Sequence, residues 1–365
     1  MKKLEHNIKE VSRHFQMPGK LVHAKRLGHG HINDTYLLTF ERNKKPLHLV
    51  LQRINHHVFK DPVALMSNFE RILTHLHAIW NEPGSVLKPL ELIPARNGKP
   101  LYHDNKGNYW RSYLFISGTS YDIPDKQNIV HSAASIFGKF QCDLSDFPSP
   151  RLNETIPDFH NTVKRFEAFE KVFERDVKNR AMLASKEIVF AMKRKTIAGV
   201  LTGLQKKKKI PERIVHNDAK LNNVIFDKQT THATTIVDLD TVMPGLVLYD
   251  FGDLVRTMTC TEDEDERNLS KISIQMPLFK AIAEGYLSTA RGFLTQCERD
   301  HMVFSGKLIT FELGLRFLTD YLEGDTYFRI HRPDQNLDRC RCQFKLVESI
   351  EEQEEEMVKI VNTCT

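Results

Sequence analysis

Several features that would place this chain in a special class are missing or scarce. No hydrophobic run reaches the roughly 20 residues that a transmembrane helix needs, so we expect no membrane span. The first residues are basic but are not followed by an apolar stretch, so we expect no signal peptide. Only 6 of the 365 residues are cysteines, too few for a secreted fold built on disulfides. We therefore expect a cytoplasmic protein.

The basic residues are also too dispersed along the chain to predict a nucleic-acid partner. The net charge is only +5, and the one dense basic run, residues 206–209, has no neighbouring aromatic residues on which bases could stack. We interpret that run as a solvated loop, with steering of phosphates as the alternative. The acidic run at residues 261–266 is likewise interpreted as a solvated loop, and binding of a cationic substrate is the alternative.

The most informative stretch is I-V-H-N-D-A-K-L-N-N-V-I-F at residues 214–226. An apolar pair leads into His216, Asp218 follows two residues later, and Asn223 follows five residues after that. These polar side chains could simply stabilise a buried turn. Their H-x-D-x-x-x-x-N spacing, however, is also typical of sites that transfer a phosphoryl group.

A second strand-like stretch at residues 234–240 ends in the carboxylates Asp238 and Asp240. Phosphoryl transfer from ATP needs a base near the acceptor hydroxyl and oxygen ligands for Mg²⁺. We therefore predict Asp218 as the catalytic base and Asn223 and Asp238 as magnesium ligands. His216, in the first stretch, and Asp240 are predicted to support the site, with a second metal contact as the alternative role of Asp240.

These residues resemble the signature of the aminoglycoside phosphotransferase and choline kinase superfamily, whose members are relatives of the protein kinases. After the two stretches, that signature continues with a glycine and a Tyr-Asp pair, which correspond here to Gly245 and Tyr249-Asp250. The longer segments H-N-D-A-K-L-N-N-V-I-F-D and I-V-D-L-D-T-V-M-P-G-L-V-L-Y-D-F-G-D are most similar to the N-acetylhexosamine 1-kinase branch. The resemblance covers nearly the whole chain.

The resemblance implies an α+β, two-lobed protein-kinase-like fold. Residues 1–117 would form a small antiparallel β N-lobe with one helix, which covers the nucleotide. Residues 118–365 would form a larger, mainly helical C-lobe that carries the catalytic and metal-binding strands and the sugar pocket.

A Gly-x-Gly turn at Gly28 and Gly30 lies between two strand-like runs. Such glycines let the backbone approach a phosphate closely, although an ordinary hairpin gives the same pattern. The segment G-H-G-H-I-N-D-T-Y also resembles the N-acetylhexosamine kinases, and this implies that Gly28, Gly30, Asn33 and Thr35 contact the nucleotide.

Residues 47–55 alternate as a β-strand should. In kinases the third strand presents a lysine to the phosphates, and no lysine is available here. The resemblance therefore implies Arg53 in that role, with Gln52 as the alternative, because a shift of one residue turns the other side chain to that face. Glu70, in the amphipathic helix predicted for residues 61–80, could pair with Arg53 or face solvent.

Residues 90–116 read as a meander of short strands. By resemblance, residues 114–118 form the hinge between the lobes, and the backbone of Phe115 and Ile116 contacts adenine. Amphipathic periodicity predicts helices at residues 129–144, 158–177, 181–204, 272–290, 301–322 and 344–361.

The stretch G-L-R-F-L-T-D-Y-L-E-G-D-T-Y-F at residues 314–328 also resembles the hexosamine 1-kinases. Arg316 and Asp320 are four residues apart, so on a helix they could simply form an ion pair. The resemblance instead implies that Arg316, Asp320 and Tyr321 line the acceptor pocket together with Asp218.

The sequence thus predicts an enzyme that uses ATP and Mg²⁺ to phosphorylate the anomeric C1 hydroxyl of N-acetylglucosamine or N-acetylgalactosamine. Its partners would be the sugar and ATP, and we expect a monomer or weak homodimer without membrane or nucleic-acid contacts. Three alternatives stay open: a choline or ethanolamine kinase, an aminoglycoside kinase, and an inactive nucleotide-binding module, which the missing lysine favours.

Overall fold

The computed structural model describes residues 6–28, 32–81 and 85–364. The chain folds into two compact units, each assembled from three segments. The first unit consists of Met1–Gly118, Ser149–Pro157 and Val237–Met243, and the second of Thr119–Pro148, Asp158–Ile236 and Pro244–Thr365. The two later segments of the first unit lie in the range that the sequence assigned to the C-lobe.

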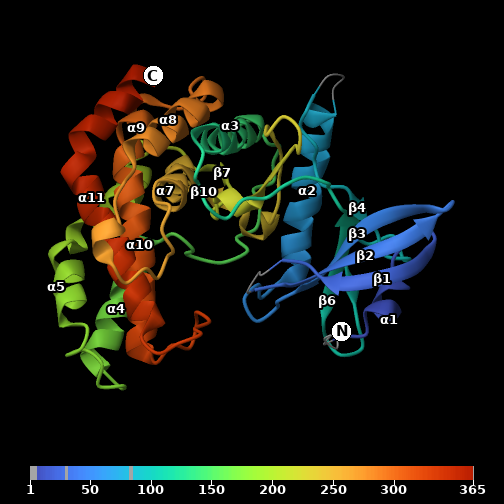
Figure 1. Ribbon diagram of the computed structural model, residues 1–365, viewed down its shortest axis with the longest axis horizontal. Helices are drawn as coiled ribbons and strands as arrows, with labels where there is room; N and C mark the ends of the chain where they lie inside the picture. The colour runs from blue at the N-terminus through green and yellow to red at the C-terminus, as the bar shows by residue number, and fades with distance from the viewer. Residues whose placement is uncertain (1–5, 29–31, 82–84, 365) are drawn as a thin grey trace. The chain divides into compact units, whose positions relative to one another are not determined.

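The described residues of the first unit form a six-stranded antiparallel sheet, drawn in blue to teal in Figure 1. The strand order is β1-β2-β3-β6-β4, and β5 also pairs with β6. A two-residue turn at Asn43 and Lys44 joins β2 to β3, and both residues have positive φ (51° and 62°), as tight hairpin turns require. The strands are β1 (Lys20–Arg26), β2 (Asp34–Arg42), β3 (Lys45–Ile54), β4 (Leu92–Ile93), β5 (Tyr102–His103) and β6 (Tyr109–Leu114).

The two faces of this sheet pack against different helices. On one face Leu49 and Leu51 join a core cluster that includes residues of α1 (Ile8–Ser12). On the other face the Arg111 guanidinium of β6 stacks 4.6 Å from the ring centroid of Phe69 in α2 (Pro62–Trp80).

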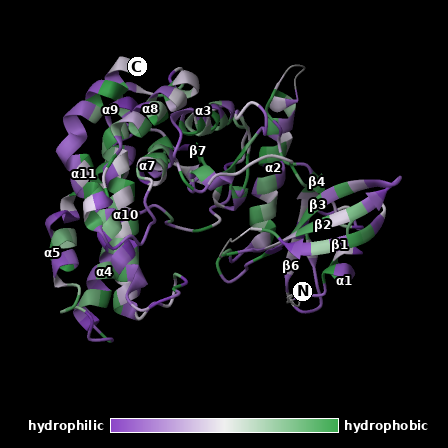
Figure 2. Ribbon diagram, in the orientation of Figure 1, coloured by the Kyte–Doolittle hydropathy of each residue, from purple (hydrophilic) through white to green (hydrophobic). Residues whose placement is uncertain are grey.

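The helix α2 forms where its sequence predicts. Asp61 caps its first turn by accepting hydrogen bonds from the backbone N–H groups of Val63 and Ala64, and Pro62 fills the first helical position, where its missing N–H costs nothing. Hydrophobic and hydrophilic residues alternate along α2 in Figure 2, as expected for a helix with one buried stripe.

The second unit is mainly helical. Two short two-stranded sheets accompany its helices: β7 (Arg213–Val215) pairs with β10 (Met243–Gly245), and β8 (Val224–Phe226) pairs antiparallel with β9 (Ala233–Ile236). The α-helices described are α3 (Gln127–Asp143), α4 (Thr162–Arg175), α5 (Ser185–Lys193), α6 (Val200–Lys206), α7 (Val247–Met258), α8 (Met276–Ala290), α9 (Gln296–Asp300), α10 (Met302–Glu323) and α11 (Gln335–Cys364).

The helices α7 and α10 approach each other unusually closely. A Cβ atom on Gly252 of α7 would lie 2.5 Å from the backbone oxygen of Ser305, and one on Gly306 of α10 would lie 2.9 Å from a methyl group of Val255. Real Cβ atoms do not come this close, so both positions need glycine. The close packing fixes α7 against α10.

The predicted fold class is confirmed: an antiparallel sheet is followed by a helical region. Two helix predictions were wrong in detail. The single helix expected at 181–204 is divided into α5, a 3₁₀ segment at Lys195–Gly199, and α6. The last helix begins at Gln335, nine residues before the predicted start. No helix within the described ranges is long and apolar enough to cross a membrane.

Candidate active site

The predicted base follows directly after β7. Asp218 keeps 26% of its side chain exposed, and Lys220 Nζ lies 2.7 Å from its Oδ2. Asn223 Nδ2 donates to the same carboxylate oxygen (3.0 Å) and to the Asp218 carbonyl (2.9 Å). Burial raises the pKa of Asp218, but the charge and hydrogen bond of Lys220, with smaller effects of His216 and Asn223, bring it below its ordinary value. The carboxylate is therefore ionised at neutral pH, as a proton acceptor must be.

The loop in front of this carboxylate is held by Asp250, a fully buried residue of α7. The backbone N–H of His216 donates to Asp250 Oδ2 (2.8 Å), and that of Asn217 donates to Oδ1 (2.7 Å). Gln141 Nε2 also donates to Oδ2 (2.6 Å), and the Tyr286 hydroxyl donates to the Gln141 carbonyl. Burial raises the pKa of Asp250, while the charge of His216 and these hydrogen bonds act in the opposite direction. Two successive peptide groups of the loop are thus anchored to one side chain.

The imidazole ring of His216 is buried in the protein core. It has no measurable exposure, and its ring lies edge-to-face against Phe137 and Phe140, at centroid distances of 5.4 and 6.1 Å. Its contribution to the site is therefore structural, through packing and through its backbone N–H.

The second pair of predicted carboxylates belongs to the first unit. Asp240 is buried and forms an ion pair with Arg111, and Asn33 Nδ2 donates to Asp240 Oδ2 at 2.7 Å. Asp238 is exposed and has a positive φ of 62°. Burial raises the pKa of Tyr113 to about 12; Arg111 lowers it, while Asp238 and Asp240 raise it further. The Asp240 carboxylate is thus fixed by Arg111 and Asn33, whereas Asp238 is exposed to solvent.

Arg111 is the cation that the sequence prediction missed. Its side chain is 1% exposed, and its Nε and Nη2 donate to Gln52 Oε1 at 2.9 and 2.6 Å. A charge inside the apolar run at residues 109–116 is the only sequence signal for it, because a buried charge requires a partner. The sequence does not say that the partner lies more than a hundred residues away.

Arg53, the predicted phosphate ligand of β3, points to the opposite face of the sheet. Its Nε donates to Asp34 Oδ2 at 2.7 Å. Since side chains alternate along a strand, Gln52, the alternative residue, shares the face that carries Asp240. Among the described residues no contact joins Arg53 to Glu70, and Glu70 is exposed.

The glycine-rich turn is described only in part. Gly28 has a φ of +71°, and a side chain there would meet no atom within 4 Å, while Gly30 lies outside the described residues. Asn33 accepts a backbone N–H of residue 55 through Oδ1 (2.9 Å), and Thr35 Oγ1 accepts from the Gln52 amide (2.9 Å). These side chains are therefore also part of the internal hydrogen-bonding network of the unit.

At the predicted hinge, the backbone N–H of Phe115 donates to the His48 carbonyl at 3.1 Å. This bond extends the pairing of β6 with β3 beyond the last residue of the strand. Ile116 is half-buried.

Asp320, predicted in the acceptor pocket, orders the loop after α10. Its two carboxylate oxygens accept hydrogen bonds from the backbone N–H groups of Thr326, Tyr327 and Phe328, at 2.8 to 2.9 Å, and from Asn336 Nδ2 at 2.8 Å. Only 3% of the residue is exposed. The carboxylate thus holds the backbone of residues 326–328.

That loop gives Arg316 an aromatic surrounding. The guanidinium carbon lies 5.4 Å from the ring centroid of Phe328, 5.6 Å from Phe159 and 5.8 Å from Tyr327. Within the described chain Arg316 forms no ion pair with Asp320, so the simple helical pair considered from the sequence is absent. Tyr321, the third predicted residue, is 1% exposed and packs in the core of the unit.

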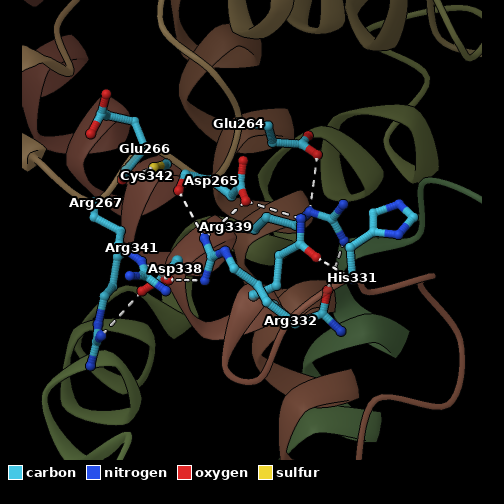
Figure 3. Close-up of polar contacts among 12 residues, drawn as sticks. Glu264, Asp265, Glu266, Arg267, His331, Arg332, Asp338, Arg339, Arg341 and Cys342 are labelled. Carbon is cyan, nitrogen blue, oxygen red and sulfur yellow. Dashed lines mark hydrogen bonds and ion pairs between the residues drawn. The ribbon is translucent and has the colours of Figure 1, made fainter.

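The acidic run is neutralised by cations of the chain itself. Figure 3 shows Arg332 between Asp265 and Asp338, and Arg339 beside Glu264. The loop is therefore neither simply solvated nor a set of unpaired carboxylates. Its ion pairs are Glu262–Lys271 (3.7 Å), Glu264–Arg256 (3.4 Å), Glu264–Arg339 (3.6 Å), Asp265–Arg332 (2.9 Å) and Glu266–Lys271 (3.3 Å).

A cavity of about 390 Å³ in the second unit connects this loop to the predicted base. Its lining includes Asp218, Lys220, Arg256, Asp122 and Asp263. A cavity of this volume lies in the range of small-molecule sites. Its position beside Asp218 makes it a candidate path or site for a substrate.

A metal ion would have to use few protein ligands here. The described residues contain no group of three or more His, Cys, Asp or Glu side chains that could hold a metal ion. Asn223 is suited to bind a metal ion. Its side-chain Nδ2 donates to Asp218, so its side-chain oxygen, Oδ1, is the atom that would contact the cation. One or two protein oxygens plus nucleotide phosphates are the usual Mg²⁺ arrangement.

Comparison with known structures supports the fold. An aminoglycoside phosphotransferase from Alicyclobacillus acidocaldarius matches with a TM-score of 0.60 at 12% identity, over 100% of this chain and 96% of that one. A choline kinase from Cryptosporidium parvum matches with 0.57 at 15% identity, over 93% and 92%. A microcompartment-associated aminopropanol kinase matches with 0.56 at 14% identity, over 96% and 97%.

The family itself is shown by the sequence. The model of the phosphotransferase enzyme family known as APH matches residues 23–286, which include the glycine-rich turn, the predicted base, both carboxylate stretches and Asp250. The chain is therefore a member of the APH phosphotransferase family, whose enzymes act on small molecules.

Proposed function

We propose that this protein is a kinase that uses ATP and Mg²⁺ to phosphorylate the anomeric C1 hydroxyl of an N-acetylhexosamine, N-acetylglucosamine or N-acetylgalactosamine. The stretches that resemble the N-acetylhexosamine 1-kinases include the predicted base and Arg316. Fold alone does not decide the acceptor, because related folds carry different chemistries. The proposal therefore depends on the charges around the predicted acceptor residues.

In this proposal Asp218 accepts the proton of the acceptor hydroxyl. Its lowered pKa and its exposure support that role. Lys220 holds the carboxylate in one orientation and partly balances its charge. Positioned acid–base groups of this kind contribute about 10²–10⁴-fold to a rate.

Asn223 and Asp238 are proposed as the magnesium ligands. Asn223 directly precedes β8, Asp238 follows β9 by two residues, and both side chains offer oxygen atoms of the kind that Mg²⁺ prefers. When bound, the ion would neutralise charge on the transferring phosphoryl group. Asp240, held by Arg111, supports the accessible carboxylate two residues earlier.

The proposed nucleotide contacts are the same as those predicted from the sequence: Gly28, Gly30, Asn33, Thr35 and the backbone at residues 115–116. Gln52 replaces Arg53 as the β3 residue that we favour, because it shares the face of Asp240. Arg111, hydrogen-bonded to Gln52, supplies the positive charge on that face in place of a β3 lysine.

The observation that carries the choice of acceptor is the charge near Arg316. In the described structure neither Arg316 nor the neighbouring Arg165 has an ion pair with a carboxylate. Burial and the charge of Arg316 lower the pKa of Arg165, against smaller raising effects of Glu312, Tyr327 and Asp158. Two guanidinium groups repel an ammonium group but donate hydrogen bonds to hydroxyl and carbonyl oxygens. A neutral sugar fits this surrounding, and Asp320 and Tyr321 support it by fixing the loop and the helix.

One observation favours a choline or ethanolamine kinase as the second candidate. Asp122 and Asp263 line the cavity beside Asp218, and within the described chain neither forms an ion pair. A cationic acceptor could use these two carboxylates. The other acidic residues of that loop are paired with arginine or lysine, which weakens this alternative.

The experiment is a panel of acceptors incubated with ATP and Mg²⁺ and followed by ³¹P NMR. The panel contains N-acetylglucosamine, N-acetylgalactosamine, glucose, choline and ethanolamine. We expect a sugar 1-phosphate signal from the two N-acetylhexosamines. Faster turnover of choline or ethanolamine than of every sugar would refute the proposal in favour of the second candidate.

A further inference from the structure

A buried histidine joins the catalytic loop to α10. His160 Nε2 lies 3.1 Å from the carbonyl oxygen of Asn217, and its Nδ1 lies 2.7 Å from Glu312 Oε1. The Thr162 hydroxyl donates to the other Glu312 oxygen at 2.6 Å. His160 is 9% exposed and Glu312 1%. A side chain of α10 is thus linked to the loop residue directly before Asp218.

The partners of His160 determine its protonation. A peptide carbonyl can only accept a hydrogen bond, and an ionised carboxylate can only accept one. Both ring nitrogens must then donate, so the ring carries two protons and a positive charge that Glu312 balances. Burial alone would lower the pKa of His160, but Glu312, helped by Asp253, raises it above the ordinary value.

The bond to Asn217 completes the anchoring of the loop. Asp250 holds the N–H groups of His216 and Asn217, while His160 holds the Asn217 carbonyl, which belongs to the next peptide group. Three consecutive peptide planes before Asp218 are therefore fixed from two sides. Asn217 has a φ of +63°, in the left-handed region that Asn tolerates better than most L-residues, and the two anchors hold its peptide groups in that conformation.

We propose that His160, held by Glu312, is a positioning residue that orients the peptide plane before Asp218 and so aims the base at the acceptor hydroxyl. This inference rests on the proposed role of Asp218. The groups that face the imidazole are Glu312 from α10, Asp253 and the Tyr249 ring from α7, and the Phe159 ring beside it in sequence.

Two substitutions distinguish a role of His160 in positioning the loop from a role limited to balancing the charge of Glu312. In His160→Gln the amide nitrogen reaches about the position of Nε2 and can still donate to Asn217. In His160→Asn it reaches about the position of Nδ1 and can donate only to Glu312. Both variants lose the positive charge and each keeps one of the two hydrogen bonds, so higher activity of His160→Gln shows that the bond to the loop matters more than the bond to Glu312.

We expect His160→Asn to lower kcat on the order of ten- to a hundred-fold with little change in KM for ATP, because misplacing a catalytic group costs factors of this size. His160→Gln should retain at least several-fold more activity than His160→Asn. Equal kcat values for the two variants, or a higher value for His160→Asn, would overturn the proposal. His77 in α2, which contacts the Leu90 carbonyl and the Asn81 amide, provides the matched control, since the same two substitutions there should leave kcat unchanged.

A second readout needs no acceptor. Hydrogen exchange of the His216 and Asn217 amides should speed up in His160→Asn and stay near wild type in His160→Gln. Should the wild-type protein phosphorylate none of the acceptors, the proposed function fails, yet the exchange comparison still tests the positioning. Identical exchange in both variants would contradict it. If either variant is too unstable to purify, adding Glu312→Gln removes the uncompensated buried carboxylate and permits the same comparison.

Discussion

The anchoring of the catalytic loop by Asp250 leads to a prediction whose magnitude follows from its contacts. Asp250 Oδ2 accepts from His216 N–H and Gln141, and Oδ1 accepts from Asn217 N–H. In Asp250→Asn one oxygen becomes an NH₂ group. Gln141 cannot turn over to compensate, because its carbonyl already accepts the hydroxyl of Tyr286. The least costly orientation therefore places two donors, the new NH₂ and the Asn217 N–H, face to face.

A buried donor left without an acceptor costs about 1–3 kcal/mol. Replacing a buried carboxylate by a neutral amide recovers part of that cost, so we expect a destabilisation toward the lower end of this range. With a urea m value of about 3 kcal/mol/M, at the upper end of the small-protein range because m grows with chain length, the midpoint of unfolding should fall by roughly 0.3–0.7 M. The loop that carries Asp218 would also lose one anchor, and kcat should fall on the order of ten-fold or more.

The assay combines a urea titration with steady-state kinetics on the purified variant. Asp300→Asn is the matched control and should change neither quantity. Asp300 is an exposed residue of the same unit, and among the residues that the structure describes its carboxylate accepts a hydrogen bond only from Gln296. If Asp250→Asn kept both the wild-type midpoint and the wild-type kcat, the carboxylate would not be what holds the loop.

Three further predictions concern the base, the metal and pH. Asp218→Asn should keep nucleotide binding, measured by calorimetry, but lower turnover by about 10²–10⁴-fold; near wild-type turnover would exclude it as the base. Asn223→Ala and Asp238→Ala should each weaken the magnesium dependence of ATP binding, and an unchanged magnesium titration in both would refute the metal assignment. The pKa of His160 is raised and that of Glu312 lowered, in each case by the partner against the effect of burial. The stability from this pair is therefore lost as pH rises through the folded-state pKa of His160 and as pH falls through that of Glu312. Urea midpoints measured from pH 4 to 9 should decline on both sides for the wild type, and His160→Gln/Glu312→Gln should lack this dependence.

Much of the fold was predictable because its signals are local. The alternation of residues 47–55 predicted a strand, and β3 occupies Lys45–Ile54. The apolar stripe at 61–80 and its Asp-Pro start predicted α2. The helix predicted at 181–204 is instead divided, and one of its boundaries, between the 3₁₀ segment and α6, falls at Gly199, since glycine disfavours a continuous helix.

Only those parts of the candidate site that depend on the spacing of residues along the chain could be predicted from the sequence. The intervals between Asp218, Asn223 and Asp238 identify a phosphotransfer motif without a structure. The partners of these residues could not be predicted: Arg111 pairs with a carboxylate 129 positions later in the chain, and the contact between His160 and Glu312 spans 152 positions. Such pairs leave no periodic pattern, because each is set by how distant elements pack.

The same limit applies to Arg53. A strand presents alternate residues to opposite faces, so choosing between Gln52 and Arg53 requires knowing which face carries Asp240, the carboxylate predicted to support the site. The position of Asp240 supplies that knowledge, and the sequence does not contain it in local form.

Phosphorylation of an N-acetylhexosamine at C1 can be tested by comparing two blocked forms of the sugar. The protein is incubated with ATP, Mg²⁺ and either the methyl glycoside of N-acetylglucosamine or the same sugar blocked at O6, and the products are read by ³¹P NMR. A site that hydrogen-bonds a specific hydroxyl can reject an analogue that lacks it by factors of about 10⁴, and a blocked anomeric oxygen cannot be phosphorylated at all. We predict no product from the methyl glycoside and a 1-phosphate from the O6-blocked sugar. Phosphorylation of the methyl glycoside at the rate of the free sugar would exclude the C1 hydroxyl as the phosphorylated group.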